Sequence, residues 1–149
     1  MNTRIANEND VPALCDLLVI LFTQEAEFFP NRSQQETGIR LILEDSSKGE
    51  IILAESDGRV IGMVNLLYTV STFLGQRVAL LEDMIVNPEF RGRGAGKKIL
   101  DAAISHAKRK GCARLTLLTG SANEGAIRFY GRSGFVRSPM IPLRLFIEK

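Results

Sequence analysis

The sequence predicts one α/β (α+β) domain over residues 1–149, with a mixed, mostly antiparallel sheet and helices on both faces. Three observations predict it. Segments with helical apolar spacing alternate with apolar segments of strand character along the chain. The two-residue turn Asp57-Gly58 joins two of the apolar runs as an antiparallel hairpin. The strand–helix–strand unit over residues 78–118 requires a parallel strand pair with a right-handed crossover.

Composition limits the classes of protein that the chain can represent. Its 149 residues suit one domain, and 19 Lys and Arg against 17 Asp and Glu leave a net charge of +2. That charge is too small to indicate a nucleic-acid binder, and no apolar run reaches the roughly 18 residues of a membrane span. The first residues lack a signal-peptide pattern, and Cys15 and Cys112 are too few for a disulfide framework. We therefore expect a cytoplasmic protein with two buried free thiols that binds neither nucleic acid nor membrane.

The first third of the chain is expected to form one strand and two helices. Residues 3–6 suit a short strand, and Asn9 or Asp10 can cap a helix that ends near residues 28–31. Apolar residues at helical spacing then predict a second, shorter helix over residues 33–44.

Three apolar strands are expected in the middle of the chain. Residues 50–55 and 59–70 flank the hairpin turn, and residues 78–86 form a third run that carries two acids, Glu82 and Asp83. Successive side chains of a regular strand face opposite sides of the sheet. Only one of these acids can therefore face a given site if the strand is regular.

The last part is expected to form two helices, a strand and a final hairpin. The helix after the glycine-rich loop carries His106 on its polar side, where no partner at metal-ligand spacing exists, so we expect a solvated histidine and no metal site. Residues 113–118 predict a strand and residues 123–132 a short helix. The closing hairpin is expected to use residues 134–136 and 143–147.

The loop at residues 91–96, Arg-Gly-Arg-Gly-Ala-Gly, lies between a predicted strand and a predicted helix. Glycines let backbone N–H groups approach an anion closely, and the N-terminus of the helix adds a favourable dipole. Arg91, Arg93 and Lys97 add positive charge that suits a pyrophosphate. The loop is therefore the strongest candidate for a ligand site.

Two familiar phosphate loops fit this segment poorly. A Walker A loop needs glycine where Arg91 stands and Ser or Thr where Lys98 stands. A dinucleotide fingerprint needs a different spacing from that of Gly92, Gly94 and Gly96, and it belongs in the first strand-to-helix turn rather than beyond mid-chain.

A third pattern, Arg-x-x-Gly-x-Gly at Arg91, Gly94 and Gly96, resembles the pyrophosphate loop of the GNAT superfamily of N-acetyltransferases. Residues 81–90 look like the strand that precedes this loop in the family. Residues 123–135 look like the family's Asn-x-x-Ala-x-x-Phe-Tyr…Gly-Phe segment. These motifs lie within about residues 79–136, whereas the expected order of elements matches the family fold over essentially the whole chain.

The resemblance implies that acetyl-CoA binds here without a metal, between the splayed strands at residues 80–86 and 113–118. Loop N–H groups would take the pyrophosphate, and a backbone N–H near Ile85 and Val86 would polarise the thioester carbonyl. Asn123 would contact the pantetheine arm, although it also suits a helix N-cap. The implied cofactor-binding residues are Ile85, Val86, Arg91, Gly92, Arg93, Gly94, Ala95, Gly96, Lys97, Asn123 and Ala126.

Two side chains are implied in proton transfer. Tyr130 matches the family's general acid, which protonates the departing thiolate; the alternative is a half-buried aromatic side chain bonded to backbone. Glu82 is the candidate general base, because an amine with a pKa of about 10.4 must lose a proton and burial raises a carboxylate's pKa. Water could serve as the base instead, with Glu82 orienting substrate or forming an ion pair. Asp83 is expected to be a structural or substrate contact.

The predicted activity is direct transfer of an acetyl group from acetyl-CoA to a primary amine of a small molecule or peptide, within a ternary complex. The alternative is a non-catalytic, regulatory acyl-CoA-binding module on the same fold. A nucleic-acid binder is disfavoured because the basic residues spread around an exposed helix face. The acceptor stays open, as does a homodimer. Candidates to face the acceptor, with core or lid packing as an equal alternative, are Phe28, Phe29, Leu66, Tyr68 and Phe73.

Overall fold

The computed structural model describes residues 1–25 and 29–147, which cluster into two compact units, Met1–Leu118 and Thr119–Lys149. The first unit contains the whole sheet and helices α1, α2 and α3, and the second contains α4. No helix in the described part of the chain is long and apolar enough to cross a membrane.

A five-stranded open sheet forms the centre of the first unit. Its strands are β1 (Asn2–Ile5), β2 (Gly49–Ser56), β3 (Arg59–Ser71), β4 (Gln76–Val86) and β5 (Cys112–Leu117). They lie side by side in chain order, antiparallel at every step except the parallel pair β4–β5. Asp57 and Gly58 have φ angles of 51° and 75°, which is the left-handed geometry of the tight hairpin turn between β2 and β3. The predicted mixed, mostly antiparallel sheet is confirmed.

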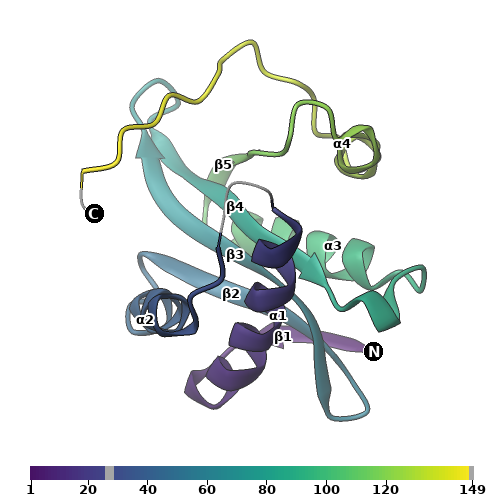
Figure 1. Cartoon of the computed structure of the whole chain (residues 1–149). Helices are drawn as coiled ribbons and strands as arrows, with labels where there is room; N and C mark the ends of the chain where they lie inside the picture. Colours follow the sequence, from purple (N-terminus) through teal and green to yellow (C-terminus); the bar gives the residue numbers. More distant parts are fainter. Residues whose placement is uncertain (26–28, 148–149) are drawn as a thin grey trace. The chain divides into compact units, whose positions relative to one another are not determined.

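Helices cover both faces of this sheet, as predicted (Figure 1). On one face, α1 (Val11–Gln24) packs against β3 and β4, and α2 (Arg32–Leu43) packs against β2. The opposite face carries α3 (Ala95–Arg109), which packs so closely that a Cβ atom added at Gly62 would lie 2.6 Å from Cδ1 of Ile99. The apolar spacing that predicted each helix therefore also fixes which side of the helix faces the sheet.

The parallel pairing of β4 with β5 covers only the first part of β4. Their pairing runs from Arg77 opposite Cys112 to Leu81 opposite Leu117, where β5 ends. The last five residues of β4 therefore have β3 on one side and no strand on the other. The pairing therefore stops because β5 is the shorter strand, and the splaying of the two strands around a ligand stays a prediction.

His106 corrects one expectation about α3. Its Nε2 atom lies 2.8 Å from Oε1 of Glu50 on β2, and only 15% of its side chain is exposed. The prediction of a solvated histidine was wrong because its partner is 56 positions away in the sequence and is brought close only by folding. Cys15 is buried, and Cys112 is half-buried; both are free thiols.

The second unit begins with a short helix. Oδ1 of Asn123 accepts a hydrogen bond from the backbone N–H of Ala126 at 3.1 Å and caps α4 (Glu124–Gly131). Residues 135–147 contain no strand, so the predicted closing hairpin was wrong. Alternating apolar residues in this segment suit a strand, but a strand also requires a hydrogen-bonding partner, and this segment does not pair with one.

Candidate active site

The loop before α3 uses its glycines for backbone conformation. Gly92 and Gly94 have φ angles of 77° and 81°, and an added Cβ would meet nothing within 4 Å at either position. Space is therefore not the constraint. An L-residue in this left-handed conformation costs roughly 1–2 kcal/mol, so the shape of the loop selects glycine.

The first N–H groups of α3, at the end of the loop, have no hydrogen-bond partner within the helix. Gly94 is the N-cap residue of α3 and has no side chain to cap the helix. The first helical hydrogen bond runs from the N–H of Lys98 to the carbonyl of Gly94 at 3.1 Å. The N–H groups of Ala95, Gly96 and Lys97 precede this bond and point out of the helix. They form an anion-binding end with the favourable helix dipole behind them.

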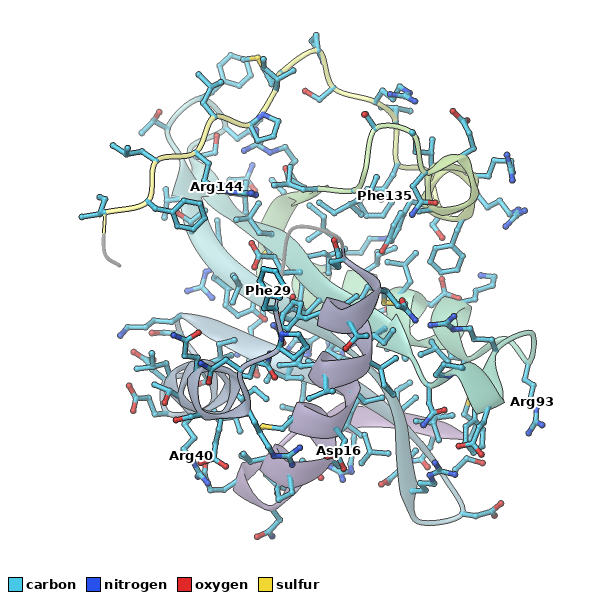
Figure 2. All side chains as sticks on the ribbon, in the orientation of Figure 1. Asp16, Phe29, Arg40, Arg93, Phe135 and Arg144 are labelled. Atoms are coloured by element: carbon cyan, nitrogen blue, oxygen red, sulfur yellow. The ribbon has the colours of Figure 1, made fainter. Side chains whose placement is uncertain are left out.

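Three basic side chains surround these donors, and each has a different anchor. Nε of Arg91 donates to the carbonyl of Val86 at 3.2 Å, which ties the loop to the end of β4. The Arg93 guanidinium lies 5.4 Å from the ring centroid of Phe90, and Figure 2 shows its side chain projecting from the loop. Lys97 pairs with Asp101 one turn along α3, at 2.8 Å. Arg91 and Arg93 therefore add positive charge to the loop, whereas the charge of Lys97 is paired with Asp101.

A β-bulge interrupts β4 next to this loop. Asn65 of β3 lies opposite Glu82, and Met63, two residues earlier in β3, lies opposite Ile85, three residues later in β4. One extra residue is therefore inserted in β4, and Asp83 takes a left-handed φ of 57°. The condition under which only one acid could face a site, a regular strand, does not hold here, because the bulge places Glu82 opposite Asn65 and lets Asp83 bond to Asn65.

Asn65 and Asp83 form a polar pair under α1. Asn65 lies on the face of the sheet that α1 and α2 cover, since its partner on β2 is the core residue Ile51. Only 3% of Asn65 is exposed, and its Nδ2 donates to Oδ2 of Asp83 at 2.7 Å. Its Oδ1 is buried and has no hydrogen-bond partner among the described residues.

The two neighbouring acids differ in environment. Burial, followed by repulsion from the nearby Glu82 and Glu25 carboxylates, raises the pKa of Asp83 to about 6, and the Asn65 hydrogen bond only partly opposes this. The Glu82 side chain is exposed, so the burial that was expected to prepare it as a base falls on Asp83 instead. The carboxyl group whose pKa burial raises is therefore that of Asp83, one residue after the predicted base Glu82, whose catalytic role stays a prediction.

The remaining predicted site residues lie at the end of β4 and on the second unit. Ile85 belongs to the core beneath α1, and the carbonyl of Val86 accepts the hydrogen bond from Arg91. On the second unit, Tyr130 packs edge-on between Phe129 and Phe135, with ring centroids 5.1 and 5.8 Å away. Burial raises the pKa of the Tyr130 hydroxyl, so it stays protonated at neutral pH.

The candidates for the acceptor pocket divide into three groups. Leu66 is fully buried, and the Tyr68 hydroxyl donates to Glu50 at 2.7 Å, so both belong to the core on the α3 side. Phe29 and Phe73 are 89% and 92% exposed. Phe28 lies outside the described residues.

Comparison with known proteins identifies the family. The model of the acetyltransferase (GNAT) family matches residues 13–135, which include the loop, the bulge and α4. The chain belongs to this GNAT family. It is 33% identical over 138 residues to the uncharacterized N-acetyltransferase YhfO of Bacillus subtilis, covering 91% of this chain and 89% of that one. The family and these N-acetyltransferase relatives support acetyl transfer as the reaction class.

Two further relatives share the fold or the motif region. Mouse thialysine N-epsilon-acetyltransferase is 38% identical over 84 residues, which cover 54% of this GNAT chain and 49% of the mouse protein. A crystal structure of a probable acetyltransferase superposes with a TM-score of 0.86 at 22% identity, over 100% of this chain and 99% of that one. The structural match shows the fold alone.

Asn65 is the site residue that sequence reasoning missed in this GNAT chain. The available signal was an amide side chain within the otherwise apolar run Val64-Asn65-Leu66-Leu67. A buried polar group in such a strand needs a partner. The partner, Asp83, becomes visible only once the bulge is known.

Proposed function

We propose that this chain transfers the acetyl group of acetyl-CoA to a primary amine of a small molecule or peptide, by direct attack in a ternary complex. The observation that carries the proposal is the continuity of β4 with the loop. The strand loses its β5 neighbour after Leu81 and ends at Val86, and the glycine-rich loop at residues 91–96 then leads into α3, whose first N–H groups have no partner within the helix. An extended thioester arm and a pyrophosphate require these two features in this order.

The residues present fit acetyl-CoA as a substrate. The N–H groups of Ala95, Gly96 and Lys97, with the positive charge of Arg91 and Arg93, suit the pyrophosphate oxygens. The unpaired edge of β4 around Ile85 and Val86 offers backbone groups to the pantetheine arm and to the thioester carbonyl. Asn123 retains its two amide N–H donors while its oxygen caps α4, so capping and ligand binding are compatible.

In the proposed reaction the amine nitrogen forms a bond to the acetyl carbon, and the carbon–sulfur bond breaks. The acceptor must first lose its ammonium proton, and we assign that proton to Asp83, directly or through a water molecule, because its pKa of about 6 lies close to neutrality. Glu82 is then the exposed carboxylate that faces the acceptor. Tyr130 supplies a proton to the departing thiolate, the role that its motif implies, and the second proton that the nitrogen loses as the amide forms restores the Tyr130 hydroxyl.

The test is acetyl-CoA-dependent thiol release against a panel of amines, combined with CoA binding to a loop variant. Gly94→Ala should weaken CoA binding at least about tenfold, because losing one charge-assisted hydrogen bond costs roughly 1.5–3 kcal/mol. Gly58→Ala is the matched control, since Gly58 has a φ of 75° and the same open surroundings. It should lose similar stability and keep its affinity for CoA.

Two results would argue against the proposal. Equal loss of CoA affinity in both glycine variants would remove the loop from the cofactor site. CoA binding without acetylation of any amine would favour the non-catalytic acyl-CoA-binding module instead.

A further inference from the structure

The C-terminal end of α1 meets the bulge of β4. α1 packs against β3 and β4, and Glu25 at its C-cap acts electrostatically on Asp83. The last turn of α1 contains no basic residue, so its carbonyl ends and the associated negative dipole are not neutralised by a nearby cation of that helix. Three carboxylates, those of Glu25, Glu82 and Asp83, therefore gather at one negative helix end.

Within the described part of the chain, residues 1–25 and 29–147, none of these three carboxylates forms a salt bridge, although nine salt bridges join other groups. Glu25 and Glu82 are also exposed, so a ligand can reach them. A concentration of like charge is unfavourable in the free protein, and a bound cation would relieve it.

A buried hydrogen-bond acceptor without a partner lies next to Asp83. Oδ1 of Asn65 has no partner among the described residues, and leaving such an atom unsatisfied costs about 1–3 kcal/mol. Turning the amide over would not help, because its oxygen would then face the Asp83 carboxylate that Nδ2 now contacts at 2.7 Å. The site therefore presents one unused acceptor together with three negative groups, and an N–H donor with positive charge fits it.

We propose that the acceptor is a dication or polycation, in which one amine reacts while a second cationic group is held by Glu25 and Glu82, with an N–H of the acceptor bonded to Oδ1 of Asn65. This inference rests on the proposed function. The reacting amine must be neutral when it attacks, so its own charge cannot pair with the cluster during the reaction. The charge that remains to pair with Glu25 and Glu82 must come from another group of the same acceptor.

The test compares three acceptors of equal length: a five-carbon diamine, amino alcohol and amino acid, carrying net charges of two, one and zero at neutral pH. We measure kcat/KM for thiol release from acetyl-CoA by the full chain. The kcat/KM of the diamine should exceed that of the amino alcohol by on the order of tenfold, which is the effect expected of two partly screened ion pairs. The amino acid should have the lowest kcat/KM. The advantage of the diamine should lie mainly in KM and should shrink with added salt.

Charge-removing variants then locate the preference. In the double variant Glu25→Gln with Glu82→Gln, the ratio of diamine to amino alcohol should fall toward one. Glu44→Gln, an exposed carboxylate at the end of α2, is the matched control and should keep the ratio of the wild type.

The outcomes separate this inference from the proposed function. Turnover of all three acceptors at similar kcat/KM, or a ratio unchanged in the double variant, overturns the dication inference and leaves acetyl transfer in place. Absence of thiol release with every amine, together with absence of CoA binding, overturns the proposed function and this inference with it.

Discussion

Glu50 and Asp83 are acidic residues of the same sheet, on opposite faces, and their environments shift their pKa values in opposite directions. Burial alone would raise the pKa of Glu50, but hydrogen bonds from His106 and Tyr68 and the charges of His106 and Lys110 outweigh it and hold that pKa below its usual value. Asp83 receives one amide hydrogen bond and has two acids as neighbours, so its pKa rises to about 6.

Hydrogen-bond donors and neighbouring charges, rather than burial alone, set the direction in which the pKa of each carboxylate shifts. Glu50 accepts from Tyr68 at 2.7 Å, lies 2.8 Å from His106 and has Lys110 at 3.5 Å, so its negative charge is fully compensated. Such a group stabilises the fold and has little tendency to take up a proton. The backbone of Asp83 has a left-handed φ of 57°, and strained backbone conformations of this kind cluster at functional sites.

The largest expected effect is on catalysis. Asp83→Asn removes the proposed base and should lower kcat/KM about a hundredfold with any amine acceptor. Asn is isosteric and accepts a left-handed φ, so the fold should be retained. Asp57→Asn is the matched control, since Asp57 also has a positive φ, 51°, in the hairpin turn. Unchanged turnover in Asp83→Asn would move the base to Glu82 or to water.

The second-largest expected effect is a loss of folding stability when Glu50 is replaced. Glu50→Ala leaves Tyr68 and His106 without an acceptor and should lower the free energy of unfolding by about 2–3 kcal/mol in urea titrations. Glu50→Gln keeps an acceptor oxygen, so it should lower the free energy of unfolding by less than Glu50→Ala does. The turnover of the folded fraction should stay within about twofold of the wild type in both variants. A loss no larger than that of Glu44→Ala would show that the compensation around Glu50 contributes little.

The pH dependence of stability should also differ between the two acids. The pKa of Asp83 is raised from 3.8 to about 6 on folding, so its protonated form favours the folded state below pH 4 and that stabilisation is lost as pH rises through 6. The pKa of Glu50 is lowered, so its contribution is present at neutral pH and is lost in acid. Between pH 4 and 7, Asp83→Asn should gain about 2 kcal/mol relative to the wild type. A pH-independent difference in unfolding free energy would contradict the raised pKa.

The contrast also shows which parts of the site were readable from the sequence. Local signals, such as the glycines at positions 92 and 94 and the Asp57-Gly58 turn, depend on neighbouring residues, and they predicted the loop, the hairpin and the order of the elements through α4. The bulge at Asp83 and the pairing of His106 with Glu50 depend on partners that are distant in the sequence. Local patterns therefore led to the wrong environments: Glu82 was expected to be buried and is exposed, and His106 was expected to be solvated and contacts Glu50.

The smallest expected effect is the loss of stability on removing the charge of Lys110, and it separates the contribution of charge from that of hydrogen bonds around Glu50. Nζ of Lys110 lies 3.5 Å from Oε1 of Glu50, beyond the distance of the Tyr68 and His106 contacts. Lys110→Met keeps the aliphatic stem and removes only the charge, so it should cost no more than about 0.5 kcal/mol of unfolding free energy. Tyr68→Phe, which deletes a 2.7 Å hydrogen bond, should cost about 1–2 kcal/mol. If Lys110→Met costs more than Tyr68→Phe, and high salt abolishes the difference, then long-range charge rather than hydrogen bonding compensates Glu50. The two acids would then differ by the sign of their neighbours' charge instead of by their donors.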